Sequence, residues 1–279
     1  MDSNFFDVTV SSKTLLTPGM LRITFCGDDL RNFRTTGMAD EYLRLFFEDE
    51  ATGELVLPII DGEGRWSYHE DRPPVRCSTY TVRRFDRRRC ELDVDFVVHP
   101  GGVASEWAQR AQAGHRMVVN NPRGLYTPTE GLPWQLILAD ATGIPAAARL
   151  IEQKPGDLAC RVVIEVATPD QIQPLPERDN VVVTWLTDSG NGHWKSRLGD
   201  VFPLIPLPPG PGHIWAAGEQ EAIRTIRKHV KNTLKLKPER HKLVAYWIDD
   251  ERLRPRRPPL DTTVLAALST PWKPAGLQS

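Results

Sequence analysis

The feature that most constrains the fold is the hydrophobic pattern that begins after Pro133. Residues 134–140 form an apolar run of strand length that ends in an acid. Similar runs recur at 161–167, 180–186, 214–218 and 243–247. Such runs are typical of parallel strands buried on both faces, which need helical crossovers between them. The second half is therefore predicted to form a doubly wound, Rossmann-like α/β domain.

Helical spacing fills two of the gaps between these runs. One predicted helix follows the TGIP turn and carries the apolar stripe Ile144, Ala147, Leu150 and Ile151. The other follows residues 214–218 and carries the stripe Ile223, Ile226, Val230 and Leu234. Thr142 occupies an N-cap position for the first helix, and Pro145 fits its first turn. Both stripes are expected to pack on the parallel sheet.

The first half of the chain has the period of β-strands. Short segments rich in β-branched or aromatic residues lie at 5–10, 20–26, 41–47 and 92–98. In the last segment apolar residues alternate with Asp93 and Asp95. Gly and Pro turns between the segments favour an antiparallel sandwich or barrel. The predicted organisation is a β-barrel domain at 1–130, an α/β domain at 131–250 and a Pro-rich tail at 251–279 with a short helix at 262–268.

Composition excludes several functional classes. The net charge of −1 gives no general attraction for nucleic acid. The four cysteines have no C-x-x-C spacing and no nearby histidine, which argues against a zinc site and fits free thiols in the cytoplasm. The N-terminal residues do not have the pattern of a signal peptide, and no apolar run approaches the roughly 20 residues of a membrane span.

Residues 76–107 contain the first candidate binding site. Tyr80 and Thr81 lie in a predicted strand, where a tyrosine ring would pack on a flat cofactor and a threonine would bond a ring nitrogen. Arg83 would offer a guanidinium to phosphate. Strand propensity alone explains the tyrosine and threonine equally well.

His99 ends the alternating strand, and the small residues of PGGVAS follow it. The amides of Val103, Ala104 and Ser105 would open a helix, and a helix N-terminus binds phosphate through its free amides and its dipole. The competing interpretation is an ordinary strand–loop–helix connection with Ser105 as the N-cap. A single histidine is weak evidence for catalysis.

Taken in order, several segments resemble the siderophore-interacting proteins, which are FAD-dependent ferric-siderophore reductases of the ferredoxin–NADP reductase superfamily. The segments are YTVRRFD, ELDVDFVVH, VAS-x-W, NNPRG, LADATGIPAAARLIE, IWAAGEQEAIRTIRKHV and AYW. They cover roughly residues 5–250 in consistent order, which is stronger than any single motif. The resemblance implies an N-terminal antiparallel Greek-key FAD-binding barrel before the Rossmann-like domain.

The resemblance also implies roles for individual residues. Tyr80 and Thr81 would contact the isoalloxazine and ribityl groups of FAD, with His99 beside the flavin. Phosphate groups would be held by Arg83, Val103, Ala104 and Ser105. The nicotinamide-facing edge and the reductant pocket would be formed by Asp140, Thr142, Gly218 and Glu219. Tyr246 and Trp247 would close the other side of the flavin. NAD(P)H or a ferredoxin would be the reductant, and no permanent metal ligand is implied.

The chain departs from the family pattern on the cofactor side. The motif Arg-x-Tyr-Thr has Ser78 in place of its arginine, and the nearest alternative, Arg76, lies about 7 Å further along an extended strand. The family's Asp-Glu-Thr reads Asp140-Ala141-Thr142. The basic residues after the final aromatic pair are replaced by Asp249, Asp250 and Glu251, and the glycine after His99 by Pro100.

Two further segments have ordinary explanations beside functional ones. The run DSGNG at 188–192 would contact a dinucleotide, although its composition is that of a turn. A basic cluster would dock an anionic siderophore or a ferredoxin, or would simply be a solvated helix face. It consists of Arg224, Arg227, Lys228, Lys231, Lys235 and Lys237.

The sequence thus leaves two functional hypotheses. The first is an FAD-dependent reductase of ferric siderophores or ferric chelates that releases Fe(II), from which a general flavin reductase differs only in substrate. The second is a repurposed scaffold of the same fold, with FAD lost or structural, that binds another small molecule or templates a non-redox biosynthetic step. Function belongs to the site and not to the fold.

Overall fold

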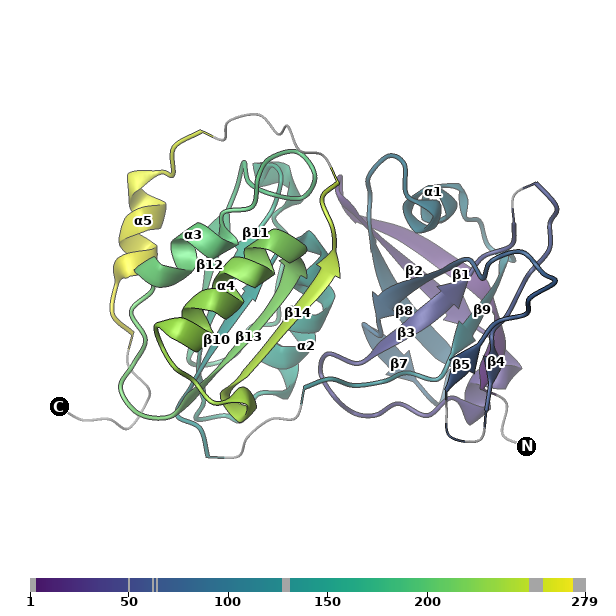
Figure 1. Ribbon diagram of the computed structural model, residues 1–279, viewed down its shortest axis with the longest axis horizontal. Coiled ribbons are helices and arrows are strands. Elements are labelled where there is room, and N and C mark those ends of the chain that lie inside the picture. The colour runs from purple at the N-terminus through teal and green to yellow at the C-terminus, as the bar shows by residue number, and fades with distance from the viewer. Residues whose placement is uncertain are drawn as a thin grey trace. The chain divides into compact units, whose positions relative to one another are not determined.

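The computed structural model describes residues 4–49, 51–61, 63, 65–126, 131–250 and 258–272 (Figure 1). The chain divides into two compact units, the first ending at Leu125 and the second beginning at Tyr126. The assignment of a flavin-binding domain to residues 1–130 and of a nucleotide-binding domain to residues 131–250 remains a prediction. Among the described helices, none combines the length and the hydropathy that crossing a membrane requires.

The first unit is built on an antiparallel sheet with the strand order β6-β3-β9-β1-β2-β8-β7. The elements of this unit are β1 (Phe5–Thr17), β2 (Met20–Cys26), β3 (Tyr42–Phe46), β4 (Ile59–Ile60), β5 (Trp66–Ser67), β6 (Cys77–Thr81), β7 (Arg84–Asp86), β8 (Glu91–Val97), α1 (Val103–Arg110) and β9 (Arg116–Asn120). Neighbouring strands are often distant in sequence, and β6 also lies against β8, so the sheet curls toward closure. The predicted antiparallel barrel is confirmed.

The alternation in β8 fills the barrel core with one face of the strand. Leu92, Val94 and Phe96 are fully buried in this core. Asp93 and Asp95 on the other face are also buried, because arginines from neighbouring strands cover them. Arg22 donates two hydrogen bonds to Asp95, at 2.6 and 2.8 Å, and Arg84 donates to Asp93 at 2.7 Å. The polar face of the strand is therefore an ion-paired layer.

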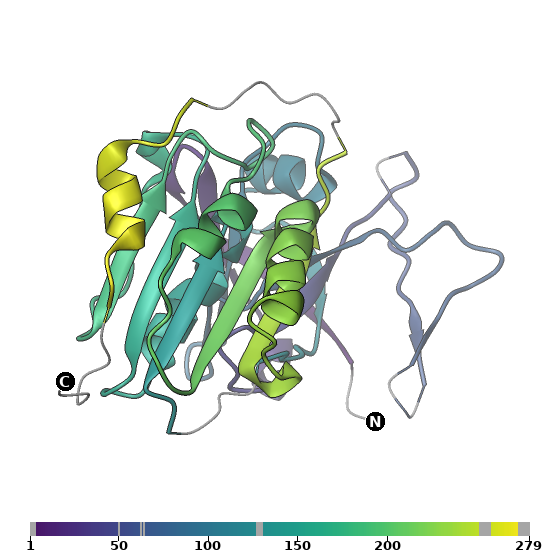
Figure 2. The same cartoon turned by 60° about the vertical axis from the view of Figure 1, so that its left-hand side comes forward.

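A two-stranded arm, β4 with β5, leaves the barrel between β3 and β6 (Figure 2). Trp66 in β5 attaches the arm to the barrel. The Trp66 ring lies 5.8 Å from that of Phe46, and the guanidinium of Arg44 stands 4.5 Å above the centre of the indole. The arm therefore has an aromatic and cation–π anchor on β3.

The second unit is a parallel sheet with the strand order β12-β11-β10-β13-β14. Its elements are β10 (Trp134–Ala139), α2 (Ile144–Gln153), β11 (Ala159–Glu165), β12 (Val181–Leu186), α3 (Leu198–Val201), β13 (Gly212–Glu219), α4 (Gln220–Asn232), β14 (His241–Trp247) and α5 (Thr262–Ser269). Helix α2 covers one face of the sheet, and α3 and α4 cover the other (Figures 1 and 2). The predicted doubly wound α/β fold is confirmed.

Three local expectations for this unit were wrong. Thr142 does not cap α2; it lies inside a 3-10 turn, Ala141–Gly143, and Asp140 caps that turn. Strand β12 is not buried on both faces, since it forms an edge of the sheet and Val182 is 55% exposed. Leu234 lies beyond the end of α4 but still packs on the same core.

The predicted helix near residue 262 is α5, and it packs on the core of the second unit. Leu268 is fully buried in that core. The guanidinium of Arg161, on β11, donates to the backbone carbonyls of Ala267 and Thr270. These bonds attach the end of α5 to the parallel sheet.

Candidate functional site

In the second unit, the candidate site is centred on the carboxylate of Asp140, where β10 ends. One carboxylate oxygen accepts from the amide and the hydroxyl of Thr142, at 2.9 and 2.6 Å. The other accepts from the Glu219 amide at 2.9 Å and from the indole N–H of Trp247 at 2.7 Å. The ends of three parallel strands, β10, β13 and β14, therefore meet at one side chain.

Asp140 is fully buried, and burial raises the pKa of its carboxyl, although the bonds from Thr142, Trp247 and the Glu219 amide offset part of that rise. Gly218 permits this arrangement, because a Cβ there would lie 2.7 Å from a carboxylate oxygen of Asp140. Glu219 is bound in turn, since its carboxylate caps α4 by accepting from the Ala222 amide at 3.0 Å.

A β-bulge in β14 sets the positions of the two aromatic residues. Gly218 of β13 pairs with Ala245, but Glu219 pairs with Trp247, so Tyr246 is the extra residue. The shift brings the indole of Trp247 to Asp140. A bulge of this kind re-aims side chains at the end of a strand. Asp140, Thr142, Gly218, Glu219 and Trp247 thus form one contiguous group.

Sequence reasoning missed a second buried acid on the next strand. Glu165 ends β11, and one oxygen of its carboxylate accepts from the hydroxyl of Ser189 and the amide of Arg197, both at 2.5 Å. Burial raises the pKa of Glu165 to about 7. The available signal was its place as the one acid in the run 161–167, near the end of that run, because ligands of such sheets bind at the carboxyl ends of the strands.

The DSGNG run is a turn and also belongs to this edge. Asp188, Gly190, Asn191 and Gly192 have positive φ angles of 51°, 61°, 56° and 76°. The amide of the Asn191 side chain donates to the carbonyl of Glu165, and its oxygen accepts from the Ala141 amide at 2.9 Å. The run therefore connects the ends of β10 and β11.

In the first unit, the candidate site begins on β6. Ser78 and Tyr80 are half-buried and Thr79 between them is exposed, so the first two share a face of the strand. The ring of Tyr80 packs 4.5 Å from that of Phe96, and burial raises the pKa of the phenol. Thr81 is buried at the end of the strand.

The start of α1 has an open geometry. Helix α1 begins at Val103, as predicted. Its N-cap is Gly102 and not Ser105, and no side chain caps the first turn. His99 is exposed, and its ring lies so close to Gly102 that a Cβ there would collide with it. Ala104 and Ser105 are buried, whereas Val103 is 37% exposed.

Ser105 connects this helix to the end of the preceding strand. Its hydroxyl donates to the carbonyl of His99 at 2.7 Å and accepts from the His99 amide at 2.9 Å. Ser105→Ala removes both bonds from a buried position and is expected to lower the free energy of unfolding by about 1–3 kcal/mol. Urea denaturation should measure this loss. Ser12→Ala, the same substitution at an exposed position of β1 in the same unit, is the control, and an equal effect in both variants would contradict the assignment.

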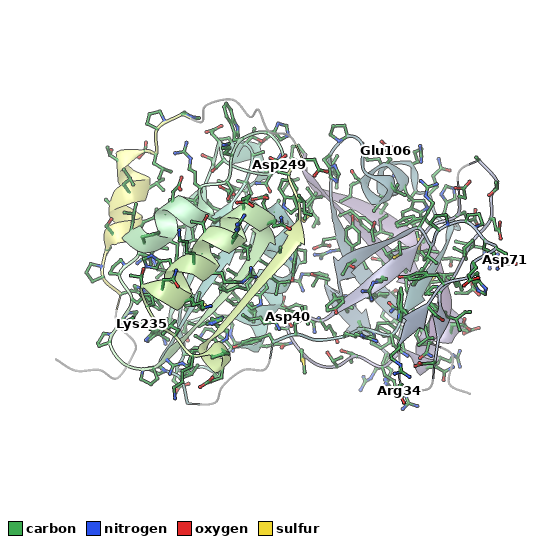
Figure 3. The ribbon with its side chains drawn as sticks, viewed as in Figure 1. Arg34, Asp40, Asp71, Glu106, Lys235 and Asp249 are labelled. Atoms are coloured by element: carbon green, nitrogen blue, oxygen red, sulfur yellow. The ribbon has the colours of Figure 1, made fainter. Side chains whose placement is uncertain are left out.

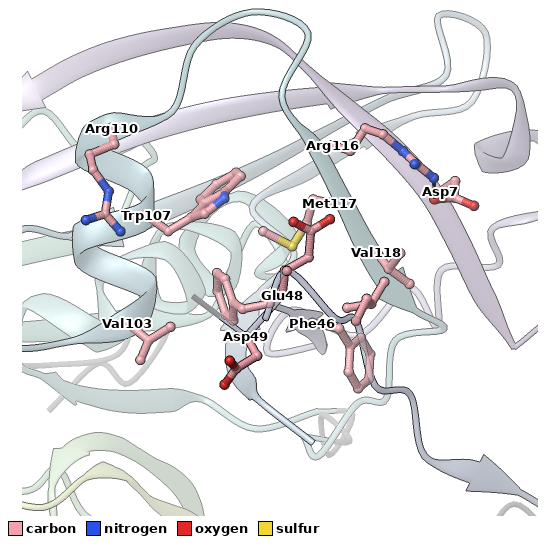
Figure 4. A pocket seen from close by; sticks show the side chains of 13 residues that line it. Asp7, Phe46, Glu48, Asp49, Val103, Trp107, Arg110, Arg116, Met117 and Val118 are labelled. Atoms are coloured by element: carbon pink, nitrogen blue, oxygen red, sulfur yellow. Dashed lines mark hydrogen bonds and ion pairs between the residues drawn. The ribbon is translucent and has the colours of Figure 1, made fainter. Parts of the chain in front are cut away.

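A pocket of about 360 Å³ lies between α1 and the segment that follows β3 (Figure 4). Val103, Trp107 and Arg110 of α1 form one wall, and Phe46 and Asp49 belong to the facing one. Both signs of charge are present, which suits a polar ligand with an apolar body.

Arg76 contacts a residue that lines this pocket. Its guanidinium forms an ion pair with Asp49, a residue of the pocket wall, at 3.5 Å. Arg83 is half-buried and follows β6, while its neighbour Arg84 pairs with Asp93. The predicted phosphate-binding residues Arg76, Arg83 and Val103–Ser105 all belong to the first unit.

The acidic replacements after the final aromatic pair are only partly described. Asp249 follows β14 and is half-buried (Figure 3). Asp250 is exposed, and Glu251 lies outside the described residues.

Two family models match the chain over nearly its whole described length. "Siderophore-interacting FAD-binding domain" matches residues 9–126, and "Siderophore-interacting protein" matches residues 132–250. The chain is 30% identical to the NADPH-dependent ferric-chelate reductase of Escherichia coli, over 88% of this chain and 94% of that protein. It is 29% identical to the ferric vibriobactin reductase ViuB of Vibrio cholerae, over 84% and 86% of the two chains.

Solved structures of other proteins have folds similar to that of this chain. A siderophore utilization protein from T. fusca superposes with a TM-score of 0.80 at 32% identity, over 89% of this chain and 95% of that one. A ferredoxin NADP⁺ reductase from Neisseria gonorrhoeae superposes with a TM-score of 0.61 at 13% identity, over 88% of this chain and 100% of that one, which shows a shared fold.

Proposed function

This chain belongs to the siderophore-interacting protein family, and on that premise we propose that it is an FAD-dependent reductase of ferric siderophores or ferric chelates that releases Fe(II). The observation that carries the proposal is the match of the FAD-binding model to the barrel, which contains the Tyr80–Thr81 strand end and the open start of α1. The relatives named as ferric-chelate and ferric vibriobactin reductases support the same chemistry.

The residues of the barrel fit a flavin nucleotide in most respects. The first turn of α1 has no side-chain cap and begins with small residues, which favours a phosphate group, although the carboxylate of Glu106 accepts from the nearby Gly101 amide at 3.2 Å. The ring of Tyr80 has a polar end, a phenol that is protonated at neutral pH and whose pKa burial raises further. The cation expected at Ser78 is missing, and Arg76 and Arg83 are the candidates to supply it.

Bound FAD would supply the conversion between two-electron and one-electron transfer. The chain's own residues would then bind and orient. We assign Tyr80, Thr81 and His99 to the flavin and ribityl groups, and Arg76, Arg83 and Val103–Ser105 to the phosphates. In the second unit, Asp140 would fix the orientation of Trp247 through its hydrogen bond. Tyr246 and Trp247 would meet the flavin.

The carboxyl edge of the parallel sheet is the proposed reductant site, lined by Asp140, Thr142, Gly218 and Glu219. Ligands of doubly wound sheets bind at this edge. The candidates are NADH, NADPH and a ferredoxin, and the basic cluster on and after α4 would receive the ferredoxin. Within that cluster Arg224 pairs with the carboxylate of Glu221, which offsets its charge, whereas Arg227 donates to the neutral carbonyl of Leu243 and keeps its charge.

Iron would enter as substrate inside its chelate. Among the described residues, no three His, Cys, Asp or Glu side chains gather as a metal site. We place the activity in the cytoplasm, because Cys26, Cys77, Cys90 and Cys160 are free thiols and a reducing compartment keeps them so.

A visible absorption spectrum of the purified protein, before and after addition of FAD and desalting, tests the proposal. We expect retained flavin near one per chain, and ferric-chelate reduction when a reductant is supplied. A chelator that develops colour with Fe(II) measures the product. A protein that retains flavin but never produces Fe(II), with NADH, NADPH or reduced ferredoxin, would contradict the reductase function.

The second candidate function is the repurposed scaffold, and one observation favours it. Ser78 is uncharged, and the guanidinium of Arg76 is engaged by Asp49. If no flavin is retained, the scaffold would bind another small molecule or template a non-redox biosynthetic step, and FAD would be absent or structural. The same spectrum separates the two functions.

A further inference from the structure

The buried carboxyl of Glu165 faces the 188–197 loop, a contact that the proposed reduction does not use. Its first oxygen accepts from the hydroxyl of Ser189 and from the amide of Arg197. Its second oxygen has no hydrogen-bond partner among the described residues. That oxygen lies against Gly190, where any Cβ would collide with it. The loop is therefore packed directly on an acid with one unsatisfied oxygen.

The same loop touches the candidate reductant site. Asn191 accepts from the Ala141 amide, at the 3-10 turn that Asp140 caps, and donates to the carbonyl of Glu165. The backbone of the loop turns through the left-handed region at Gly190 and Asn191. Any opening of the loop from Glu165 must therefore disturb the contact with the turn beside Asp140.

The electrostatics of the carboxyl favour its neutral form when the loop is closed. The pKa of Glu165 lies at about 7, because burial and the negative charge of Asp140 on the neighbouring strand raise it more than the bonds from Arg197, Ser189 and Ser196 lower it. The guanidinium of Arg197 is directed to the carbonyl of Pro258. The other titratable side chains on the loop are Asp188, His193 and Lys195.

We propose that Glu165 is a proton-dependent latch: its neutral form holds the 188–197 loop closed on the carboxyl edge, and its ionisation releases the loop. A buried charge with an unsatisfied oxygen is costly, whereas an open loop lets water solvate it. Closure therefore takes up a proton. Its stability is fully present below the ordinary carboxyl pKa of 4.5 and is lost as the pH rises through about 7. The consequence for the reductant rests on the proposed function, but the loop motion does not.

Hydrogen exchange of the full-length protein, followed by mass spectrometry between pH 5 and pH 8.5 and corrected for intrinsic rates, tests the latch. With the two pKa values above, loop opening should increase about tenfold between pH 6 and pH 8 in a peptide that covers residues 187–197. A peptide from β2 serves as the reference, because it belongs to the other unit. Glu165→Gln keeps the shape and cannot ionise, so its loop should exchange without this pH dependence.

Ser189→Ala keeps the acid and removes one bond, so its loop should open more at every pH and retain the pH dependence. This variant keeps the test valid even if Glu165→Gln folds poorly. An unchanged exchange ratio across the pH range in the wild-type protein overturns the latch, as does a wild-type pH dependence in Glu165→Gln. The measurement needs neither flavin nor reductant. A pH-dependent loop in a protein that reduces no iron chelate would leave the latch intact and refute the proposed function.

Discussion

Ser78→Arg is expected to tighten FAD binding between about tenfold and a hundredfold. The substitution restores the arginine of the family motif on the strand face that carries Tyr80. A guanidinium bonds a phosphate with two parallel charge-assisted hydrogen bonds, and such bonds are worth about 1.5–3 kcal/mol. Fluorescence titration of FAD with the apoprotein measures the dissociation constant directly.

The matched control for this experiment is Thr79→Arg. It adds the same charge one residue along, on the exposed face of β6. A general effect of positive charge would act on both variants, whereas the motif contact would act only at position 78. If Ser78→Arg binds FAD no better than Thr79→Arg does, the flavin phosphates do not lie along this face of β6.

Asp140→Ala should be the most destabilising substitution at the carboxyl edge, by roughly 3–5 kcal/mol. The carboxylate is the acceptor for the amides of Thr142 and Glu219 and for the indole of Trp247. Each donor that is left buried without an acceptor costs about 1–3 kcal/mol. Urea denaturation, followed by far-UV circular dichroism, should show the second unit unfolding at a lower urea concentration.

Two further variants serve as comparisons for this result. Asp157→Ala removes an exposed carboxylate from the same unit and should change the free energy of unfolding by less than about 0.5 kcal/mol. Asp140→Asn keeps one acceptor oxygen, so its loss should be intermediate. A small loss in Asp140→Ala, comparable to that of Asp157→Ala, would mean that the raised pKa of this buried carboxyl reflects a desolvation cost that cancels the value of its bonds.

The central strands and helices of the second unit were predictable because their patterns are local. The apolar run of β10 and the stripe of α2 specify buried elements without reference to the rest of the chain. The order of the strands in the sheet, in contrast, depends on contacts between segments that are distant in sequence. The run that became β12 has much the same composition as the central strands, and only its place at the sheet edge exposes Val182.

The buried acids show the same limit of prediction from local sequence. Asp140 ends an apolar run, and the family resemblance implied its place at the candidate site. Glu165 occupies the equivalent position on β11, but its partners Ser189 and Arg197 lie in a distant loop whose left-handed backbone brings them close. Likewise, alternation placed Asp93 opposite the core but gave no sign that Arg84 would cover it. Contacts of this kind depend on tertiary structure.

The bulge in β14 makes the pairing of Tyr246 depend on the length of the strand. Because Tyr246 is one residue in excess over β13, deleting the residue before it would place Tyr246 opposite Gly218 and leave Trp247 opposite Glu219 in regular pairing. The side chain opposite Gly218, beside Asp140, would then change without any substitution. Insertions and deletions in this strand, rather than point mutations, are thus a direct route by which chains of this fold would diversify the edge where the reductant is proposed to bind.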